Sequence, residues 1–172
     1  ETPDASMPPH MKKDPLRQWR EATRALGLPL HCHYSGIWDK ALARKHPEWC
    51  VVAPPPKEPE KAAQNVCNNP SEMMCVRSDY VTKFMIPQLL ELIDRYGVDG
   101  FWIDGDLWAS GPCYCERCRA AWRKETGIAD PPVDPEDPLW PRWWSFALDS
   151  FNAYVTRYCD AVHAHTVSYT HL

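Results

Sequence analysis

Three cysteines lie within six residues of the sequence, in the segment GPCYCERCRAAW. Cys113, Cys115 and Cys118 have the residue type and close spacing of metal ligands, because thiolates bind zinc and a structural zinc site takes four ligands. One loop can fill three corners of a tetrahedron, so the fourth ligand must come from elsewhere, and Cys67 and Cys75 are both candidates. The alternative is a group of reduced thiols without a metal.

Two carboxylates lie upstream of these thiols, near the end of the apolar run DGFWIDGDLW. Asp104 and Asp106 suit the hydrolysis of a glycosidic bond, which needs one carboxyl as acid/base and a second as nucleophile or base. Aromatic walls would hold the sugar, and Trp102, Trp108 and Tyr34 are placed to supply them. Two structural alternatives stay open: Asp104 could cap the loop that follows, and most of the nine Trp residues could be core residues.

The elements that must position these residues are helices alternating with strands. Asp14 caps a first helix that begins at Pro15 and stops at Gly27. In chain order we predict a helix at 15–26, a strand at 28–35, a helix at 79–96, a strand at 98–104, and helices at 116–126 and 142–165. The inward face of the first helix is predicted to carry Leu16, Trp19, Thr23 and Leu26.

The segment from Gly36 to Arg77 contains six Pro and shows no sustained periodicity. A loop of that length in a compact domain is usually functional or contains short elements of its own. The helix that follows opens at Ser78 and Asp79, closes at Gly97, and should kink at proline 87. Its inward side chains are predicted to be Val81, Met85, Leu89, Leu92 and Tyr96.

Strands that alternate with helices indicate parallel βα units in an α/β fold. Two strands cannot close a sheet, so we expect a partial TIM (β/α)8 barrel, truncated at both ends, in which catalytic groups follow the carboxyl ends of the strands. A doubly wound sheet is the second choice, because neither strand is followed by a Gly-rich phosphate turn. Residues 1–166 would form this partial catalytic barrel. The tail VSYTHL, residues 167–172, resembles a translated sequencing adapter, the alternative being a natural C-terminus.

The two strand segments resemble those of α-L-fucosidase-like hydrolases and related uncharacterised barrel hydrolases. YGVDGFWIDGD is similar to the fourth-strand segment of that family, whose Trp-Phe-Asp-Gly run ends in the nucleophilic aspartate, so the resemblance implies that Asp104 is the nucleophile. HCHYSGIWD is similar to the family's YYSxxDW strand, which implies that Tyr34, Trp38 and Asp39 face the cleft. His33, near the end of that strand, could also touch a substrate hydroxyl.

The thiol segment resembles a second family, the zinc-containing β-galactosidases of glycoside hydrolase family 42. Those enzymes carry a Cys-x-Cys-x-x-Cys loop after the fourth strand, one upstream cysteine, and a segment like ARKHPEW, found here at residues 43–49. This resemblance favours Cys75 as the fourth ligand of a structural zinc. It does not extend to the catalytic residue, because those enzymes end the fourth strand in Asn-Glu, whereas this chain has Asp104-Gly105.

Together these features predict a retaining, exo-acting glycoside hydrolase, fucosidase- or galactosidase-like, with a second carboxyl supplied by the rest of the protein. A non-catalytic carbohydrate-binding or degenerate barrel is the alternative. The expected partner is a carbohydrate, with homo-oligomerisation also open for the full-length protein. The net charge of −4 with scattered Lys and Arg argues against nucleic acid, and no apolar run approaches the ~20 residues of a membrane helix. Three isolated cysteines favour a reducing, cytoplasmic location: Cys32, Cys50 and Cys159.

Overall fold

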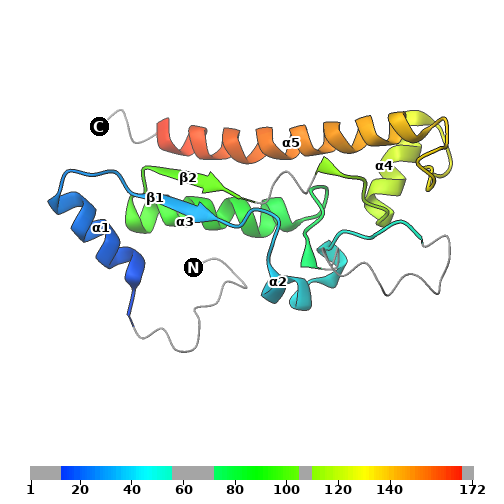
Figure 1. Cartoon of the computed structure of the whole chain (residues 1–172). Helices are drawn as coiled ribbons and strands as arrows, with labels where there is room; N and C mark the ends of the chain where they lie inside the picture. Colours follow the sequence, from blue (N-terminus) through cyan, green and yellow to red (C-terminus); the bar gives the residue numbers. More distant parts are fainter. Residues whose placement is uncertain (1–12, 56–71, 105–109, 168–172) are drawn as a thin grey trace.

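The computed structural model describes residues 13–55, 72–104 and 110–167. Its centre is a small parallel sheet of two strands, β1 (His31–Tyr34) and β2 (Gly100–Ile103). Helix α3 (Ile86–Tyr96) packs against α1 (Pro15–Ala25) on one side and against α5 (Trp140–Val167) on the other. Figure 1 shows α5 running along the length of the molecule beside β2 and α3. The mixed helix and strand composition agrees with the predicted α/β class.

Helix α1 begins where the sequence predicts and ends one residue earlier, at Ala25. Asp14 accepts a hydrogen bond from the backbone N–H of Arg17 at 3.0 Å, and Gly27 follows the helix with a φ of 64°. The predicted inward face is wrong at Trp19 and Leu26, which are 65% and 71% exposed, whereas Leu16 is partly buried and packs against the core. Arg20 is the buried residue of this helix instead.

Strands β1 and β2 pair in parallel with His31 opposite Gly100 and Tyr34 opposite Ile103. Both strands are shorter than predicted. Their register places apolar side chains on one face of the sheet and exposed side chains on the other. Tyr34, Phe101 and Ile103 pack toward the core that α3 and α5 share with the sheet. Because side chains alternate along a strand, His31, His33 and Trp102 belong to the opposite face, and all three are exposed.

The segment predicted as a long loop contains short elements. Helix α2 (Lys40–Lys45) is followed by a 3₁₀ turn, η1 (Pro47–Trp49). Isolated antiparallel bridges pair Trp38 with Met73 and Cys50 with Met74. These elements are too short to produce a periodic pattern, which explains why the sequence did not reveal them.

The predicted helix between the strands is two elements, a π-helical turn, η4 (Val81–Met85), and then α3. Proline 87 lies in the first turn of α3, directly after the π-helical turn, so the irregularity of this helix is a wide turn ahead of the proline. Val81, Met85 and Leu89 are buried as predicted. Gly97 ends α3 in the left-handed region, with a φ of 62°.

Helix α4 (Glu116–Thr126) has the predicted bounds, and Gly127 ends it with a φ of 74°. Helix α5 starts two residues earlier and ends two residues later than predicted. Residues 168–172 of the proposed adapter tail lie outside the described residues. Across the described ranges, no helix has the length and apolar character needed to cross a membrane.

A buried arginine joins α1 to the start of both strands. Arg20 donates from Nη1 to the Gly97 carbonyl at 2.8 Å and to Asp99 Oδ2 at 2.6 Å, and from Nη2 to the Leu28 carbonyl at 3.3 Å. Asp99 Oδ2 also accepts the backbone N–H of Leu30 at 2.7 Å. The Leu30 amide, and then Arg20, lower the pKa of Asp99 below its ordinary value.

We predict that Arg20→Met lowers the free energy of unfolding by roughly 1–3 kcal/mol, because hydrogen bonds to charged groups are lost while the bulk of the side chain remains. The exposed Arg24→Met is the matched control and should be near neutral. Because folding lowers the pKa of Asp99, its stabilisation is present at neutral pH and is lost as the pH falls below about 4. Arg20→Met should reduce this acid sensitivity, and urea unfolding from pH 7 to pH 3 would measure both effects. Equal stability of the two variants would contradict a stabilising role for Arg20.

Candidate functional site

Asp104 lies at the carboxyl edge of the sheet, together with the end of β1. Its backbone N–H donates to the carbonyl of Tyr34 at 2.8 Å, which continues the strand pairing by one step. Its Oδ2 lies 3.1 Å from Nε2 of His33. Both side chains are well exposed, His33 at 59% and Asp104 at 64%. The structure therefore brings Asp104, His33 and Tyr34 to one edge, as the sequence predicted.

An exposed indole lies on the same sheet face. Trp102 is 71% exposed and pairs with His33 across the strands. One step earlier, the ring of His31 lies over Gly100, where an added Cβ would come within 2.5 Å of His31 Cδ2. Because Gly100 has no side chain, the ring of His31 can lie against its backbone. The face presents two imidazoles and one indole beside a carboxylate.

A hollow of about 220 Å³ lies beside this edge. Tyr34 closes one part of it by donating from its hydroxyl to Gln88 Oε1 at 2.8 Å, and the buried Tyr80 donates to the Gly36 carbonyl. Burial raises the pKa of the Tyr80 hydroxyl well above its usual value, so it stays a neutral donor. The lining residues are His33, Tyr34, Ser35, Gly36, Trp38, Asp39, Tyr80 and Gln88.

Four of the six predicted substrate-binding residues line this hollow: His33, Tyr34, Trp38 and Asp39. Trp102 is described but is not part of the lining. The sixth, Trp108, lies outside the described residues, as does Asp106, the second predicted catalytic carboxylate. Tyr80 and Gln88 were missed, because they come from the helix between the strands and carry no local motif.

Asp39 caps a helix at the wall of the hollow. Its Oδ1 accepts the backbone N–H of Leu42 at 2.8 Å, so it caps the first turn of α2. Trp38, directly before it, is half-buried and packs against the main core. The loop after β1 is therefore fixed at the point where its side chains reach the hollow.

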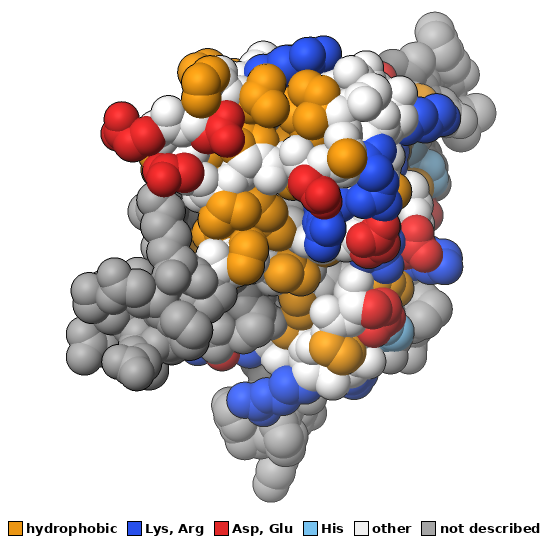
Figure 2. Space-filling model, turned by 90° about the vertical axis from the view of Figure 1, so that its right-hand side faces the viewer, with side chains coloured by type: hydrophobic (Ala, Val, Ile, Leu, Met, Phe, Trp, Pro, Cys, Tyr) orange, Lys and Arg blue, Asp and Glu red, His pale blue; other side chains and the backbone are white. Residues whose placement is uncertain are grey.

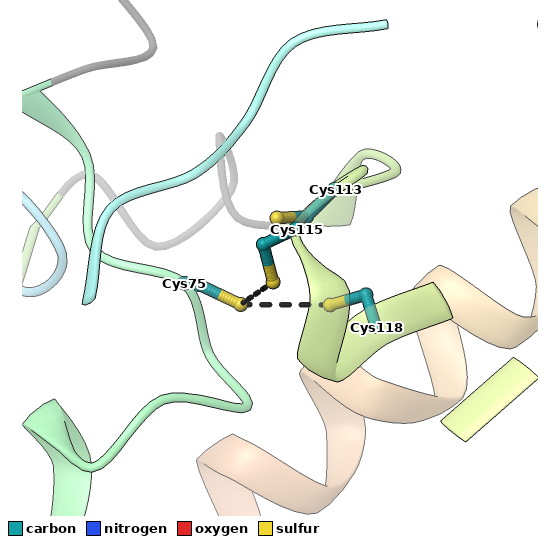
Figure 3. Close-up of side chains that lie close together, drawn as sticks. All are labelled: Cys75, Cys113, Cys115 and Cys118. Carbon is teal, nitrogen blue, oxygen red and sulfur yellow. Dashed lines mark hydrogen bonds between the residues drawn. The ribbon is translucent and has the colours of Figure 1, made fainter. Parts of the chain in front are cut away.

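The second candidate site is a cluster of buried thiols (Figure 3). The sulfurs of Cys75, Cys113, Cys115 and Cys118 all lie within 4.8 Å of one another. Cys75 Sγ is 3.5 Å from Cys118 Sγ and 3.7 Å from Cys115 Sγ, so these pairs are not disulfides. The cluster contains the four cysteines that the sequence singled out. Cys67, the other candidate, lies outside the described residues.

Backbone hydrogen bonds bring the thiols together from separate segments. Cys75 N–H donates to the Trp49 carbonyl at 2.7 Å, and Tyr114 N–H donates to the Val52 carbonyl at 2.9 Å. Val52 in turn donates its N–H to Cys113 Sγ at 3.4 Å. Residues 49–52 therefore lie between Cys75 and the thiol segment and bond to both. Cys115 stands at the start of α4, and Cys118 lies in its first turn.

The thiols shift one another's pKa in opposite directions. Hydrogen bonds from Cys113, then from Cys118 and Cys75, lower the pKa of Cys115. Hydrogen bonding to Cys113, and then to Cys115, raises the pKa of Cys118 and of Cys75. Like charges in a buried site disfavour one another, so a cation among the sulfurs would favour their thiolate forms.

Aromatic side chains cover the thiol cluster. Trp122 and Trp143 are fully buried and meet edge to face, with ring centroids 5.2 Å apart. Phe146 stacks on Trp143 at 5.2 Å. Figure 2 shows hydrophobic side chains gathered on the face at this end of the molecule. A hollow of about 470 Å³, lined in part by Val52 and Tyr114, adjoins the thiol segment.

Comparisons with known proteins place the segment that contains the sheet and Asp104 in a family. The model of a family described as hypothetical glycosyl hydrolase 6 matches residues 5–105, which includes β1, β2 and Asp104 but ends before the thiol segment. Among solved structures, α-L-fucosidase isoenzyme 2 from Paenibacillus thiaminolyticus is similar, with a TM-score of 0.65 and 20% sequence identity. The likeness covers 91% of this chain and 22% of the fucosidase, and it shows a shared fold. No curated protein matches the sequence.

We predict that Asp39→Ala lowers the free energy of unfolding by about 1 kcal/mol, because the cap of α2 is lost. Asp39→Asn is the matched control, and it should stay within a few tenths of a kcal/mol because an amide oxygen also caps. Urea unfolding of the two variants measures the difference. Equal stability of Asp39→Ala and the parent chain would show that the cap contributes nothing.

Proposed function

This chain belongs to the hypothetical glycosyl hydrolase 6 family, and we propose that it is part of a glycoside hydrolase in which Asp104 is the nucleophile. The position of Asp104 carries the proposal. This carboxylate follows a strand at the carboxyl edge of a parallel sheet, beside an exposed indole and a polar hollow. The family membership and the fold shared with a fucosidase support the class of reaction.

We further propose that β1 and β2 are neighbouring strands of a (β/α)8 barrel. Among the described residues, the helices pack on one face of the sheet, and the other face exposes His31, His33 and Trp102. In such a barrel this second face would point to the interior, and its carboxyl edge would be the floor of the catalytic site. The match covers 22% of the longer fucosidase chain, which agrees with this chain contributing two strands of such a barrel.

In the proposed reaction, a carboxylate oxygen of Asp104 forms a bond to the anomeric carbon of a terminal sugar. The glycosidic C–O bond breaks, and its electron pair leaves with the aglycone oxygen, which takes a proton from a second carboxylic acid of the protein. Water then attacks the glycosyl ester, gives its proton to that second group, and releases Asp104. Trp102 would stack on the apolar face of the sugar, while residues of the hollow bind its hydroxyls. In this retaining scheme the two carboxyls would lie about 5–5.5 Å apart.

We propose that the thiol cluster holds a structural zinc. A tetrahedral zinc with bonds of about 2.3 Å separates its sulfurs by about 3.8 Å. Here Cys75 Sγ lies 3.5 Å from Cys118 Sγ and 3.7 Å from Cys115 Sγ. Four thiolates close the coordination sphere, so the ion would offer no position for a reacting water. Its role would be to tie residues 49–52, Cys75 and the start of α4 into one unit.

We predict that Asp104→Asn lowers kcat by at least about 10³-fold, because an amide cannot form the glycosyl ester. Asp106→Asn should lower kcat far less. The assay uses 4-nitrophenyl glycosides, α-L-fucoside and β-D-galactoside first, with the protein that carries this chain in its complete barrel. Comparable losses in the two variants would point to a shared binding role instead. Sugar binding without turnover of any glycoside would favour the non-catalytic barrel.

We predict that the chain binds one zinc and that Cys118→Ser weakens or abolishes this binding. A loss of about 4 kcal/mol would lower the melting temperature by roughly 8–16 °C in a domain of this size. Cys32→Ser is the matched control, since this half-buried thiol lies apart from the cluster. Metal analysis and thermal unfolding with and without a chelator measure both effects. A chain that contains no metal and melts identically with Cys118→Ser would contradict the zinc proposal.

A further inference from the structure

The side chain of Asp104 contacts His33 on the neighbouring strand. Nε2 of His33 lies 3.1 Å from Oδ2 of Asp104, a normal hydrogen-bond length. Asp104 must be ionised to act as a nucleophile, and an ionised carboxylate only accepts hydrogen bonds. The shared proton therefore resides on Nε2 of His33, which is the donor.

The strand register explains why this histidine can reach the carboxylate. His33 is opposite Trp102, and Asp104 follows Trp102 by two residues, so both side chains emerge on the exposed face. Asp104 lies two residues beyond the position opposite His33, so the two side chains meet diagonally across the strands. An imidazole is long enough to span this distance. The Asp104 backbone is fixed at the same time by its N–H bond to the Tyr34 carbonyl at 2.8 Å.

His31 shows that the contact depends on position within this face. It lies on the same strand and the same exposed face as His33, two residues earlier. Its ring lies over Gly100, at the other end of the strand pair, and no hydrogen bond to Asp104 is found for it among residues 13–55 and 72–104. The two histidines therefore differ in one respect that matters, the bond to the carboxylate.

We propose that His33 is a positioning residue that orients the carboxylate of Asp104 for attack on the anomeric carbon. This inference rests on the proposed function of Asp104. The Nε2–H bond restricts rotation of the exposed carboxylate and directs one of its oxygens toward His33. A group held close to its attack geometry reacts faster than one that must be ordered during the reaction. His33 thus acts through Asp104, and the sugar need not touch it.

The test compares the parent enzyme with His33→Met, His33→Gln, His31→Met and Asp104→Asn. The substrate is the 4-nitrophenyl glycoside that the complete protein hydrolyses best, because nitrophenolate leaves without help from an acid and the first step then reports attack by Asp104. Thermal unfolding checks that each variant is folded. Gln is the informative replacement, since its amide N–H can stand near the position of Nε2–H.

We expect His33→Met to lower kcat and kcat/KM by roughly 10- to 100-fold, the effect of one hydrogen bond to a charged group, with KM within about threefold. His33→Gln should recover most of the loss, and His31→Met should stay within about twofold. An unchanged kcat in His33→Met, or a rise in KM alone, would overturn the proposal, the latter by making His33 a substrate contact. Equal losses in His31→Met and His33→Met would also overturn it. Full activity of Asp104→Asn would instead overturn the proposed function.

Discussion

The parallel pairing of β1 with β2 is the constraint on which the rest of the structure depends. It places Tyr34 opposite Ile103 and lets Asp104 continue the ladder by one hydrogen bond. Parallel strands require a long crossover, and here that crossover supplies α2, α3 and the walls of the hollow. A shift of the register by one residue would move Asp104 and Trp102 to the opposite face. The Arg20–Asp99 bond fixes the start of both strands, and so stabilises the register from the other end.

A second constraint acts on the loops at the carboxyl edge. The thiol cluster joins three segments that no regular sheet or helix connects: residues 49–52, Cys75 and the start of α4. Four buried sulfurs at these separations are unfavourable as anions and contribute little as neutral thiols. A divalent cation would resolve this conflict, and its binding energy would add to the folding energy of the loops.

Local signals in the sequence were sufficient for some elements and insufficient for others. The bounds of α1 and α4 follow from capping residues such as Asp14, Gly27 and Gly127, which act within one turn. Burial of Arg20 could not be read in this way, because its partner Asp99 is 79 residues away. Residue type and spacing predicted the three thiols of the loop, whereas the resemblance to the family 42 β-galactosidases favoured Cys75 over Cys67 as the fourth. Gln88 was not predictable, because its contact with Tyr34 depends on the packing of α3 against the sheet.

Covalent trapping of the nucleophile tests the central claim most directly. A 2-deoxy-2-fluoro glycosyl fluoride slows the hydrolysis of the glycosyl ester, so the sugar stays attached to the attacking carboxylate. Our account predicts that peptide mass spectrometry of the trapped protein finds one added sugar, with fragment ions that place it on Asp104 and not on Asp106. An added sugar on any other carboxylate, or turnover that continues with no trapped ester, would contradict the account.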